Sequence, residues 1–137
     1  MTDRIYDGAL DLIGRTPLVR LSRIAGGKGA EICGKLESSN VGGSVKDRPA
    51  LSMVLAAEAA GQLQSGPTIV EPEDMSEARR LLLKSYGAEV VLTASEDGMA
   101  GAVEQAERIL STTPGALMCG QFDNPANPDV HAKTTAE

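Results

Sequence analysis

The sequence predicts an α/β fold in which helices cover both faces of a reduced parallel sheet, giving three layers. Short apolar runs alternate with helix-length segments from residue 68 to residue 119, which is the pattern of successive βαβ units. Glycine and proline are spread along the chain, and no repeat or linker divides it. The length of 137 residues supports one hydrophobic core, so we expect a single domain.

Two strand-like segments, residues 17–21 and 31–37, occupy the first part of the chain. They are separated by the turn-rich sequence Ala25-Gly26-Gly27-Lys28-Gly29, in which glycine supplies the backbone freedom that turns need. The two segments can therefore pair as a hairpin.

A helix is expected to start at Ser44. Ser44 and Asp47 have the spacing of an N-terminal cap, and Pro49 falls in the first turn, where a missing N–H costs little. Residues 50–60 are apolar on nearly every face, which predicts a mostly buried helix. Gly61 is its expected end.

The alternating region predicts strands at residues 68–70, 90–92 and 116–119, and helices at residues 76–86 and 98–110. Ligands bind at the carboxyl ends of parallel strands, so chemistry is expected in the loops that follow these strands. The last loop, residues 120–128, is rich in Asn and Pro and is expected to be irregular. The helix expected at residues 98–110 has an apolar stripe, which predicts core packing for Met99, Ala102, Val103, Ala106, Ile109 and Leu110.

Composition excludes several classes of partner. Nineteen acidic and thirteen basic residues give a net charge of -6, with no Trp, two Tyr and one Phe, so no nucleic-acid partner is expected. Cys33 and Cys119 lie in apolar stretches without CxxC spacing, which predicts buried free thiols and no metal site. The sequence shows no secretory signal and no stretch long enough to span a membrane, so we expect no membrane association and a cytoplasmic location.

The segment before the expected helix start is the most informative one. Gly42 and Gly43 lead into a helix N-terminus, where free backbone N–H groups can meet an anion. In the simpler interpretation the glycines only make the turn, Ser44 only caps, and Lys46 and Arg48 are solvated. In the functional interpretation, partial burial and the helix dipole favour the neutral amine of Lys46, which suits Schiff-base chemistry with an aldehyde cofactor.

The chain closely resembles the amino-terminal half of the cysteine synthases, or O-acetylserine sulfhydrylases, of the fold-type II pyridoxal-phosphate family. The resemblance covers essentially the whole chain and rests on an ordered set of phrases: Ile13-Gly14-Arg15-Thr16-Pro17-Leu18-Val19-Arg20-Leu21, Lys35-Leu36-Glu37-Ser38, Gly42-Gly43-Ser44-Val45-Lys46-Asp47-Arg48, Met75-Ser76-Glu77-Ala78-Arg79-Arg80, Gly87-Ala88-Glu89-Val90-Val91-Leu92-Thr93 and Gln121-Phe122-Asp123-Asn124-Pro125-Ala126-Asn127-Pro128.

This resemblance implies roles for two residues. Lys46 corresponds to the lysine that holds pyridoxal phosphate and moves protons on the substrate, and Gln121 to a residue that helps bind the substrate carboxylate. Without the resemblance, Gln121 is an ordinary exposed loop amide. The implied activity is replacement of the acetate of O-acetylserine by sulfide to give cysteine, with a homodimer and a complex with serine acetyltransferase as possible assemblies.

Two departures from the family change these expectations. A Thr-Ser-Gly-Asn-Thr-Gly loop, a helix and a strand are missing where Glu71-Pro72 runs directly into Glu73-Asp74. The family's Gly-Thr-Gly-Gly-Thr phosphate site corresponds to positions beyond Glu137. The resemblance then divides the chain into residues 1–40 as a stranded piece of the larger family domain, 41–120 as a reduced smaller domain, and 121–137 as the start of the return to the larger domain.

Three hypotheses follow for function. The chain descends from cysteine synthases but is not expected to turn over substrate alone, because only two parts of the site remain. It can instead be a non-catalytic remnant of the same ancestry that still docks on a partner chain. The third hypothesis is a small structural or interaction domain that binds no ligand. A sibling activity, such as cystathionine or threonine-pathway chemistry, stays possible because those relatives share the lysine motif. Strands without their usual sheet also predict marginal stability or self-association.

Overall fold

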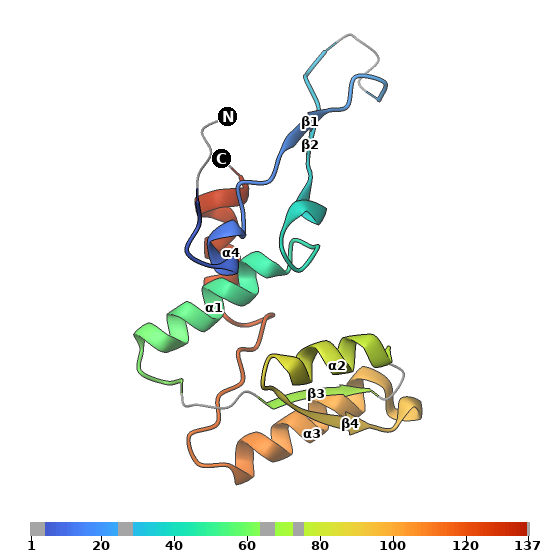
Figure 1. The fold of residues 1–137 in the computed structure, drawn as a ribbon, viewed down its shortest axis with the longest axis vertical. Coiled ribbons are helices and arrows are strands. Elements are labelled where there is room, and N and C mark those ends of the chain that lie inside the picture. Colours follow the sequence, from blue (N-terminus) through green and yellow to red (C-terminus); the bar gives the residue numbers. More distant parts are fainter. Residues whose placement is uncertain (1–4, 25–28, 64–67, 73–75, 137) are drawn as a thin grey trace. The chain divides into compact units, whose positions relative to one another are not determined.

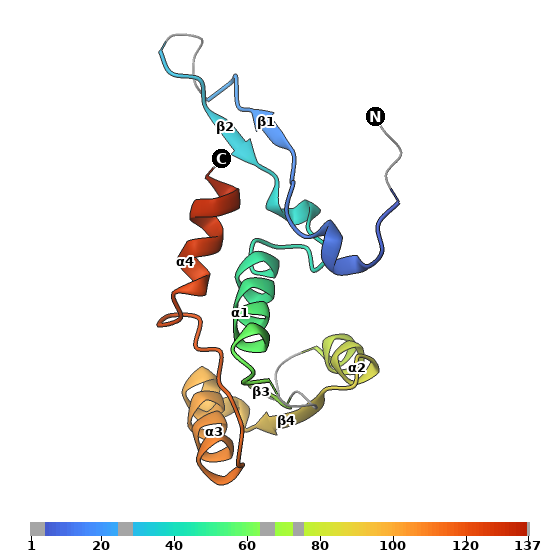
Figure 2. The same cartoon turned by 90° about the vertical axis from the view of Figure 1, so that its left-hand side faces the viewer.

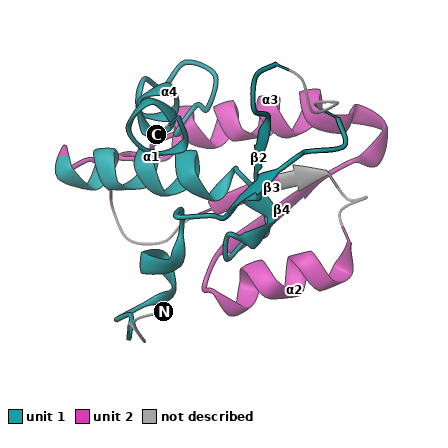
Figure 3. Ribbon diagram, turned by 90° about the horizontal axis from the view of Figure 1, so that it is seen from above, with its two compact units in different colours: residues 1–59, 119–137 teal, residues 60–118 magenta. Residues whose placement is uncertain are grey.

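The computed structural model describes residues 5–24, 29–63, 68–72 and 76–136, with only the backbone at Glu71 and Pro72. Two compact units are formed by residues 1–59 with 119–137, and by residues 60–118 (Figure 3). The breaks between these units differ from the division expected at residues 40 and 120, whose assignment to pieces of two family domains stays a prediction. The expected turn at 25–28 and the join at 73–75 lie outside the described residues.

The first unit contains the predicted hairpin (Figure 1). Strand β1 (Leu18–Arg20) pairs antiparallel with β2 (Cys33–Lys35), and Val19 lies opposite Gly34. All three residues of β1 are exposed. Two 3-10 turns, η1 (Ala9–Leu12) and η2 (Glu37–Ser39), flank the pair. The hairpin prediction is confirmed, although both strands are shorter than expected.

Helix α1 (Asp47–Ala59) begins three residues later than expected. The Ser44 hydroxyl accepts a hydrogen bond from Lys46 N at 3.1 Å, which holds a turn before the helix rather than its first residue. The helix ends two residues before Gly61, whose φ of 68° is the left-handed conformation typical of a helix stop.

The prediction that α1 is mostly buried is wrong. Its buried side is formed by Arg48, Pro49, Met53 and Ala57. Val54 and Leu55 are 43% and 49% exposed. Within its unit, α1 packs along one side against α4 (Ala126–Val130), and the Ser52 hydroxyl donates to the Ala126 carbonyl at 2.9 Å. One helix cannot cover the whole circumference of another.

Part of the loop expected at residues 120–128 is helical, because α4 starts at Ala126 and continues into the π-helical turn η4 (His131–Thr135). The Asn124 side-chain oxygen accepts from Ala126 N at 3.0 Å and satisfies a free donor of the first turn. Pro128 lies in that same first turn, where its missing N–H breaks no helical hydrogen bond. The proline-rich composition therefore fits a helix start.

The second unit has the three-layer arrangement. Strands β3 (Thr68–Pro72) and β4 (Glu89–Thr93) pair in parallel, with Val70 opposite Val91. Helices α2 (Glu77–Ser85) and α3 (Gly98–Thr112) cover opposite faces of this pair (Figure 2). The predicted three-layer α/β class with a reduced parallel sheet is confirmed.

A third strand, expected at residues 116–119, does not form. Among the described strands, β3 and β4 pair only with each other, and residues 116–119 join neither outer edge of this pair. The α3 stripe is only partly core: Ala102 is 3% exposed, whereas Met99 and Val103 are 65% and 49% exposed. A sheet of two strands, which lie about 4.8 Å apart, is too narrow to cover the whole apolar stripe of α3.

Both predictions of buried cysteines are wrong, because Cys33 is exposed on the hairpin and Cys119 is half-buried. Cys33 lies on β2, whose partner strand has no packed layer over it. Among the described residues, no helix has the length and apolar character needed to cross a membrane. The same residues contain no cluster of three or more side chains suited to a metal ion.

Candidate functional site

The two residues singled out from the sequence meet in the first unit. Lys46 immediately precedes α1, and Gln121 lies in the turn that leads to α4. The Lys46 Nζ donates a hydrogen bond to Gln121 Oε1 at 3.2 Å, although the two residues are 75 positions apart. Lys46 is exposed and Gln121 is half-buried. The structure thus brings the pair together, and their functional roles stay predictions.

Two asparagines shape the turn that carries Gln121. The Asn127 side-chain amide donates to the Gln121 carbonyl at 2.6 Å. The Asn124 amide donates to the Cys119 carbonyl at 2.8 Å. The Asn127 bond ties the Gln121 backbone to the first turn of α4, and the Asn124 bond closes the turn before it. The Asn-Pro phrase, which seemed only irregular in the sequence, therefore fixes the backbone that carries the Gln121 side chain.

The glycine loop before Lys46 is built for a close turn. Gly43 has a φ of 79°, and its N–H donates to the Asn40 carbonyl at 2.9 Å. The Gly42 N–H donates to the Asp47 carboxylate, and a Cβ at Gly42 would clash with Asp47 Oδ1. The Gly42 N–H is therefore already bonded to Asp47, which agrees with the simpler interpretation that this glycine only makes the turn.

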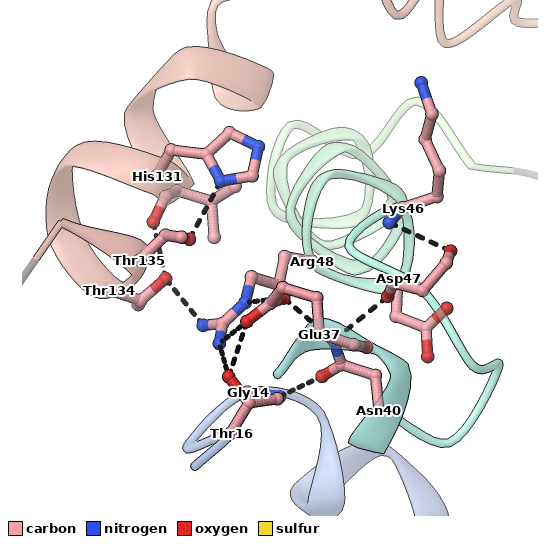
Figure 4. A network of polar contacts seen from close by, with 12 residues as sticks. Gly14, Thr16, Glu37, Asn40, Lys46, Asp47, Arg48, His131, Thr134 and Thr135 are labelled. Atoms are coloured by element: carbon pink, nitrogen blue, oxygen red, sulfur yellow. Dashed lines mark hydrogen bonds and ion pairs between the residues drawn. The ribbon is translucent and has the colours of Figure 1, made fainter. Parts of the chain in front are cut away.

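Arg48, two residues after Lys46, forms a buried ion pair with Glu37 (Figure 4). The Arg48 guanidinium is 3% exposed and donates to both carboxylate oxygens of Glu37, from Nε at 2.7 Å and from Nη2 at 2.8 Å. It also donates to the Thr134 hydroxyl at 3.1 Å. The interpretation that Arg48 is solvated is wrong, because its guanidinium finds acceptors from three separate segments.

Two further polar residues complete this cluster. The Thr16 hydroxyl accepts from Arg48 at 3.0 Å and donates to Glu37. The Asn40 amide donates to Glu37 Oε2 at 2.9 Å and to the Ser44 carbonyl at 3.0 Å. In the described part of the chain, Thr16, Asn40 and Arg48 are the buried polar residues, and all three belong to this one cluster. Burial of polar side chains costs little stability when their donors and acceptors are hydrogen-bonded, as they are in this cluster.

The cluster strongly favours the ionised carboxylate. The hydrogen bond from Arg48 lowers the pKa of Glu37 from its ordinary 4.5 to about 2, against the opposing effect of burial, with help from Thr16 and Asn40. The same hydrogen bond raises the pKa of Arg48, again against burial. The ion pair therefore persists across the whole neutral range.

Sequence reasoning missed this cluster. Glu37 and Arg48 each stand in one of the phrases that carry the family resemblance, but they are separated by 11 positions and by a glycine loop. The available signal was Arg48 in the first turn of an apolar helix, beside Pro49. No local spacing rule connects it to Thr16, which is 32 positions away.

Comparison with known proteins identifies the family of this chain. The sequence pattern described as pyridoxal-phosphate dependent enzyme matches residues 9–71 and 56–137. Together the two matches take in nearly the whole chain, which therefore belongs to the family of pyridoxal-phosphate dependent enzymes.

Within that family, the relatives are cysteine synthases. The chain is 41% identical to the cysteine synthase of Flavobacterium sp. (strain K3-15), an alignment that covers 96% of this chain and 51% of the relative. It is 40% identical to the probable cysteine synthase of Bacillus subtilis (strain 168), covering 97% of this chain and 51% of the relative. The chain thus spans about half the length of the curated relatives it matches.

Solved structures give the same result. An O-acetylserine sulfhydrylase, isoform 3, of Entamoeba histolytica superposes with a TM-score of 0.83 at 30% identity, covering 99% of this chain and 49% of that one. A cysteine synthase of the same organism superposes with a TM-score of 0.81 at 32% identity, covering 96% and 48%.

The expected internal deletion is confirmed. The alignment with the Flavobacterium protein spans 157 positions, whereas the whole chain has 137 residues, so at least 20 positions of that relative have no residue opposite them here. The family pattern matches the chain as two separate segments, which overlap at residues 56–71, instead of as one continuous segment. The gap is therefore internal to the aligned part of the chain.

Proposed function

We propose that this chain is a cysteine synthase-type protein that binds pyridoxal phosphate through Lys46 and the substrate carboxylate through Gln121. The observation that carries the proposal is the hydrogen bond between the Lys46 amine and the Gln121 amide, which brings the attachment group and the carboxylate donor to one place. The family pattern and the 41% identity to a cysteine synthase support it.

The residues present fit the aldehyde end of the cofactor. The Lys46 side chain is exposed, and none of the ion pairs among the described residues involves it. No salt bridge in this part of the chain therefore has to break before the amine reacts. When bound, pyridoxal phosphate acts as an electron sink for charge that develops at the substrate α-carbon.

Each side chain then has a distinct task. The Lys46 amine holds the cofactor and carries a proton to or from the α-carbon. Gln121 has an amide NH₂ group besides its oxygen, so it can donate to a substrate carboxylate once the lysine is engaged. We propose O-acetylserine as the amino-acid substrate and sulfide as the incoming nucleophile, with free acetate as the leaving group and cysteine as the product.

Turnover by these 137 residues alone is not part of the proposal. The sequence contains no Thr-Ser-Gly-Asn-Thr-Gly phrase, and at least 20 positions of the Flavobacterium relative have no residue opposite them here. Without this loop, carboxylate binding falls to Gln121, and catalysis that depends on several positioned groups is lost when most of them are absent. We therefore expect binding of the cofactor without efficient β-replacement.

A second candidate is a non-catalytic interaction domain of the same family. Exposed large apolar side chains on one element favour it: Leu82 is 50% and Tyr86 75% exposed, four positions apart on α2 and its C-terminal cap. Such surfaces often mark protein contacts. A second copy of the chain and serine acetyltransferase are the partners we propose for this role, and both are tested by co-purification.

Labelling with the cofactor tests the main proposal. The purified chain is incubated with pyridoxal phosphate, reduced with borohydride and mapped by peptide mass spectrometry. We expect the label mainly on Lys46, and we expect Lys46→Arg to abolish it while keeping the positive charge. Lys133→Arg is the matched control, because Lys133 is an exposed lysine of the same unit and its loss should leave the Lys46 label unchanged.

Label spread evenly over Lys46, Lys84 and Lys133 would contradict cofactor binding at a defined site. Cysteine formation from O-acetylserine and sulfide is assayed in parallel. A turnover rate in the ordinary range for enzymes, about 1 to 1000 per second, would contradict the expectation that the chain lacks efficient activity.

A further inference from the structure

A continuous chain of hydrogen bonds connects the buried ion pair to the backbone that carries Lys46. We propose that Glu37, Asn40 and Arg48 are positioning residues that fix the Lys46 amine opposite Gln121. This inference rests on the proposed function of Lys46 and extends it to a set of residues that do not touch the reacting atoms.

The first step runs from Arg48 to both sides of the site. Its guanidinium donates two hydrogen bonds to the Glu37 carboxylate and a third to the Thr134 hydroxyl in η4. The turn of Gln121 leads through α4 into η4 without a break. A single planar side chain therefore anchors both the segment before Lys46 and the helical segment after Gln121. A lysine at this position would keep the charge but lose the fork geometry.

The second step runs from Glu37 through Asn40 to the lysine loop. The Asn40 side-chain NH₂ donates to the Glu37 carbonyl, the Glu37 carboxylate and the Ser44 carbonyl, at 2.9 to 3.0 Å. Its oxygen accepts from Gly14 N at 2.8 Å. Ser44 is two residues before Lys46, and its hydroxyl accepts from Lys46 N. Asn40 is 5% exposed, so water cannot replace these bonds cheaply.

The third step concerns the direction of the lysine side chain. The Lys46 side chain points away from the cluster, and its amine contacts none of the three residues (Figure 4). The influence of the cluster on the amine must therefore pass through the backbone. A flexible four-carbon stem reaches a defined point only when its backbone origin is fixed, and small misplacements of a reacting group are costly.

Asn40→Asp is the variant that tests this inference, because it keeps the size of the side chain and removes its two donors. Met53→Ala is the matched control: Met53 is buried at 7% exposure in the same helix and lies outside the cluster. Both variants are labelled with pyridoxal phosphate and borohydride under conditions in which circular dichroism shows them folded. The readout is the ratio of label on Lys46 to label on Lys133 in the same molecule.

We expect Asn40→Asp to lower this ratio about tenfold, because a displacement of about 1 Å can cost a reaction up to about 100-fold. Met53→Ala should keep the ratio within about twofold, because it changes packing and not the hydrogen bonds of the loop. A wild-type ratio in Asn40→Asp would overturn the inference. An equal fall in Met53→Ala would also overturn it, because the cluster would then contribute stability only.

A second readout separates this inference from the proposed function. If wild-type Lys46 shows no preference for pyridoxal phosphate, the proposed function fails, and the amine is probed with N-hydroxysuccinimidyl acetate, which needs no cofactor site. Positioning then predicts that the Lys46 to Lys133 acetylation ratio changes at least about threefold in Asn40→Asp and stays constant in Met53→Ala. An unchanged ratio in Asn40→Asp would overturn positioning by this route as well.

Discussion

The guanidinium of Arg48 holds both carboxylate oxygens of Glu37, at 2.7 and 2.8 Å, within two residues of Lys46. Arg48 belongs to helix α1 and Glu37 to the turn η2, so this pair fixes the helix start against the segment that precedes the glycine loop. Breaking a buried pair leaves an uncompensated charge, whereas breaking an exposed pair leaves two solvated groups. Stability and the geometry of the lysine loop therefore depend on the same contact.

Arg48→Ala should lower the free energy of unfolding by about 3 kcal/mol, because Glu37 would remain partly buried without its charged partner. Urea unfolding followed by circular dichroism measures the change. Arg20→Ala is the control: Arg20 pairs with Glu31 on the surface of the hairpin, and its loss should cost less than about 1 kcal/mol. An equal loss of unfolding free energy in the two variants would show that the buried Arg48 pair stabilises the chain no more than the exposed Arg20 pair does.

The pH dependence of stability should show the titration of Glu37. Its pKa is about 2 in the folded chain and near 4.5 when unperturbed, so the unfolded state binds its proton first. The stabilisation by Glu37 is fully present above about pH 5 and is lost as the pH falls from 4.5 towards 2. The urea concentration at the unfolding midpoint, measured between pH 7 and pH 3, should decrease as the pH drops below about 4.5. Glu37→Gln should have a flatter profile, and a profile as steep as that of the wild type would contradict the assignment.

Gly43→Ala should destabilise the chain by about 1 kcal/mol, since alanine at a φ of 79° brings its Cβ close to the following carbonyl oxygen. It should also reduce labelling of Lys46 by pyridoxal phosphate, because the loop would relax towards negative φ. Gly8→Ala is the matched control, with a φ of -160° and no atom within 4 Å of the added Cβ. Its stability should stay within about 0.5 kcal/mol of the wild type.

The chain should self-associate at micromolar concentration through apolar side chains of α2. Leu82 and Tyr86 are 50% and 75% exposed and, four positions apart, lie on one side of the helix and its cap. Sedimentation velocity should show a concentration-dependent rise in mass that the double substitution Leu82→Lys and Tyr86→Lys reduces. Ala100→Lys, on α3, adds charge elsewhere and should change little. A sharp, cooperative melt of a dilute monomer would contradict the expected marginal stability or self-association.

Local patterns predicted the elements well where a short segment decides its own structure. The hairpin, the parallel pair β3 and β4, and helices α2 and α3 all follow from runs of apolar residues and from glycine positions. The strand expected at 116–119 did not form, because an apolar run becomes a strand only when its backbone pairs with a sheet edge, and this segment joins neither edge of the β3 and β4 pair. The burial of α1 was overestimated because helix propensity and apolar content do not specify how many neighbours a helix has.

For the site, the sequence by itself determined the family and the two residues to test, because the ordered phrases around Lys46 and Gln121 are local and specific. Only the tertiary structure decided that these two side chains meet across 75 positions and that Arg48 is buried in a cluster. The physical reason is that hydrogen bonding of buried charges depends on which distant segments fold together. Arg48 meets Thr16, Glu37 and Thr134 only after segments distant in the sequence have folded against the start of α1. Glu37 in turn bonds to Thr16 and Asn40.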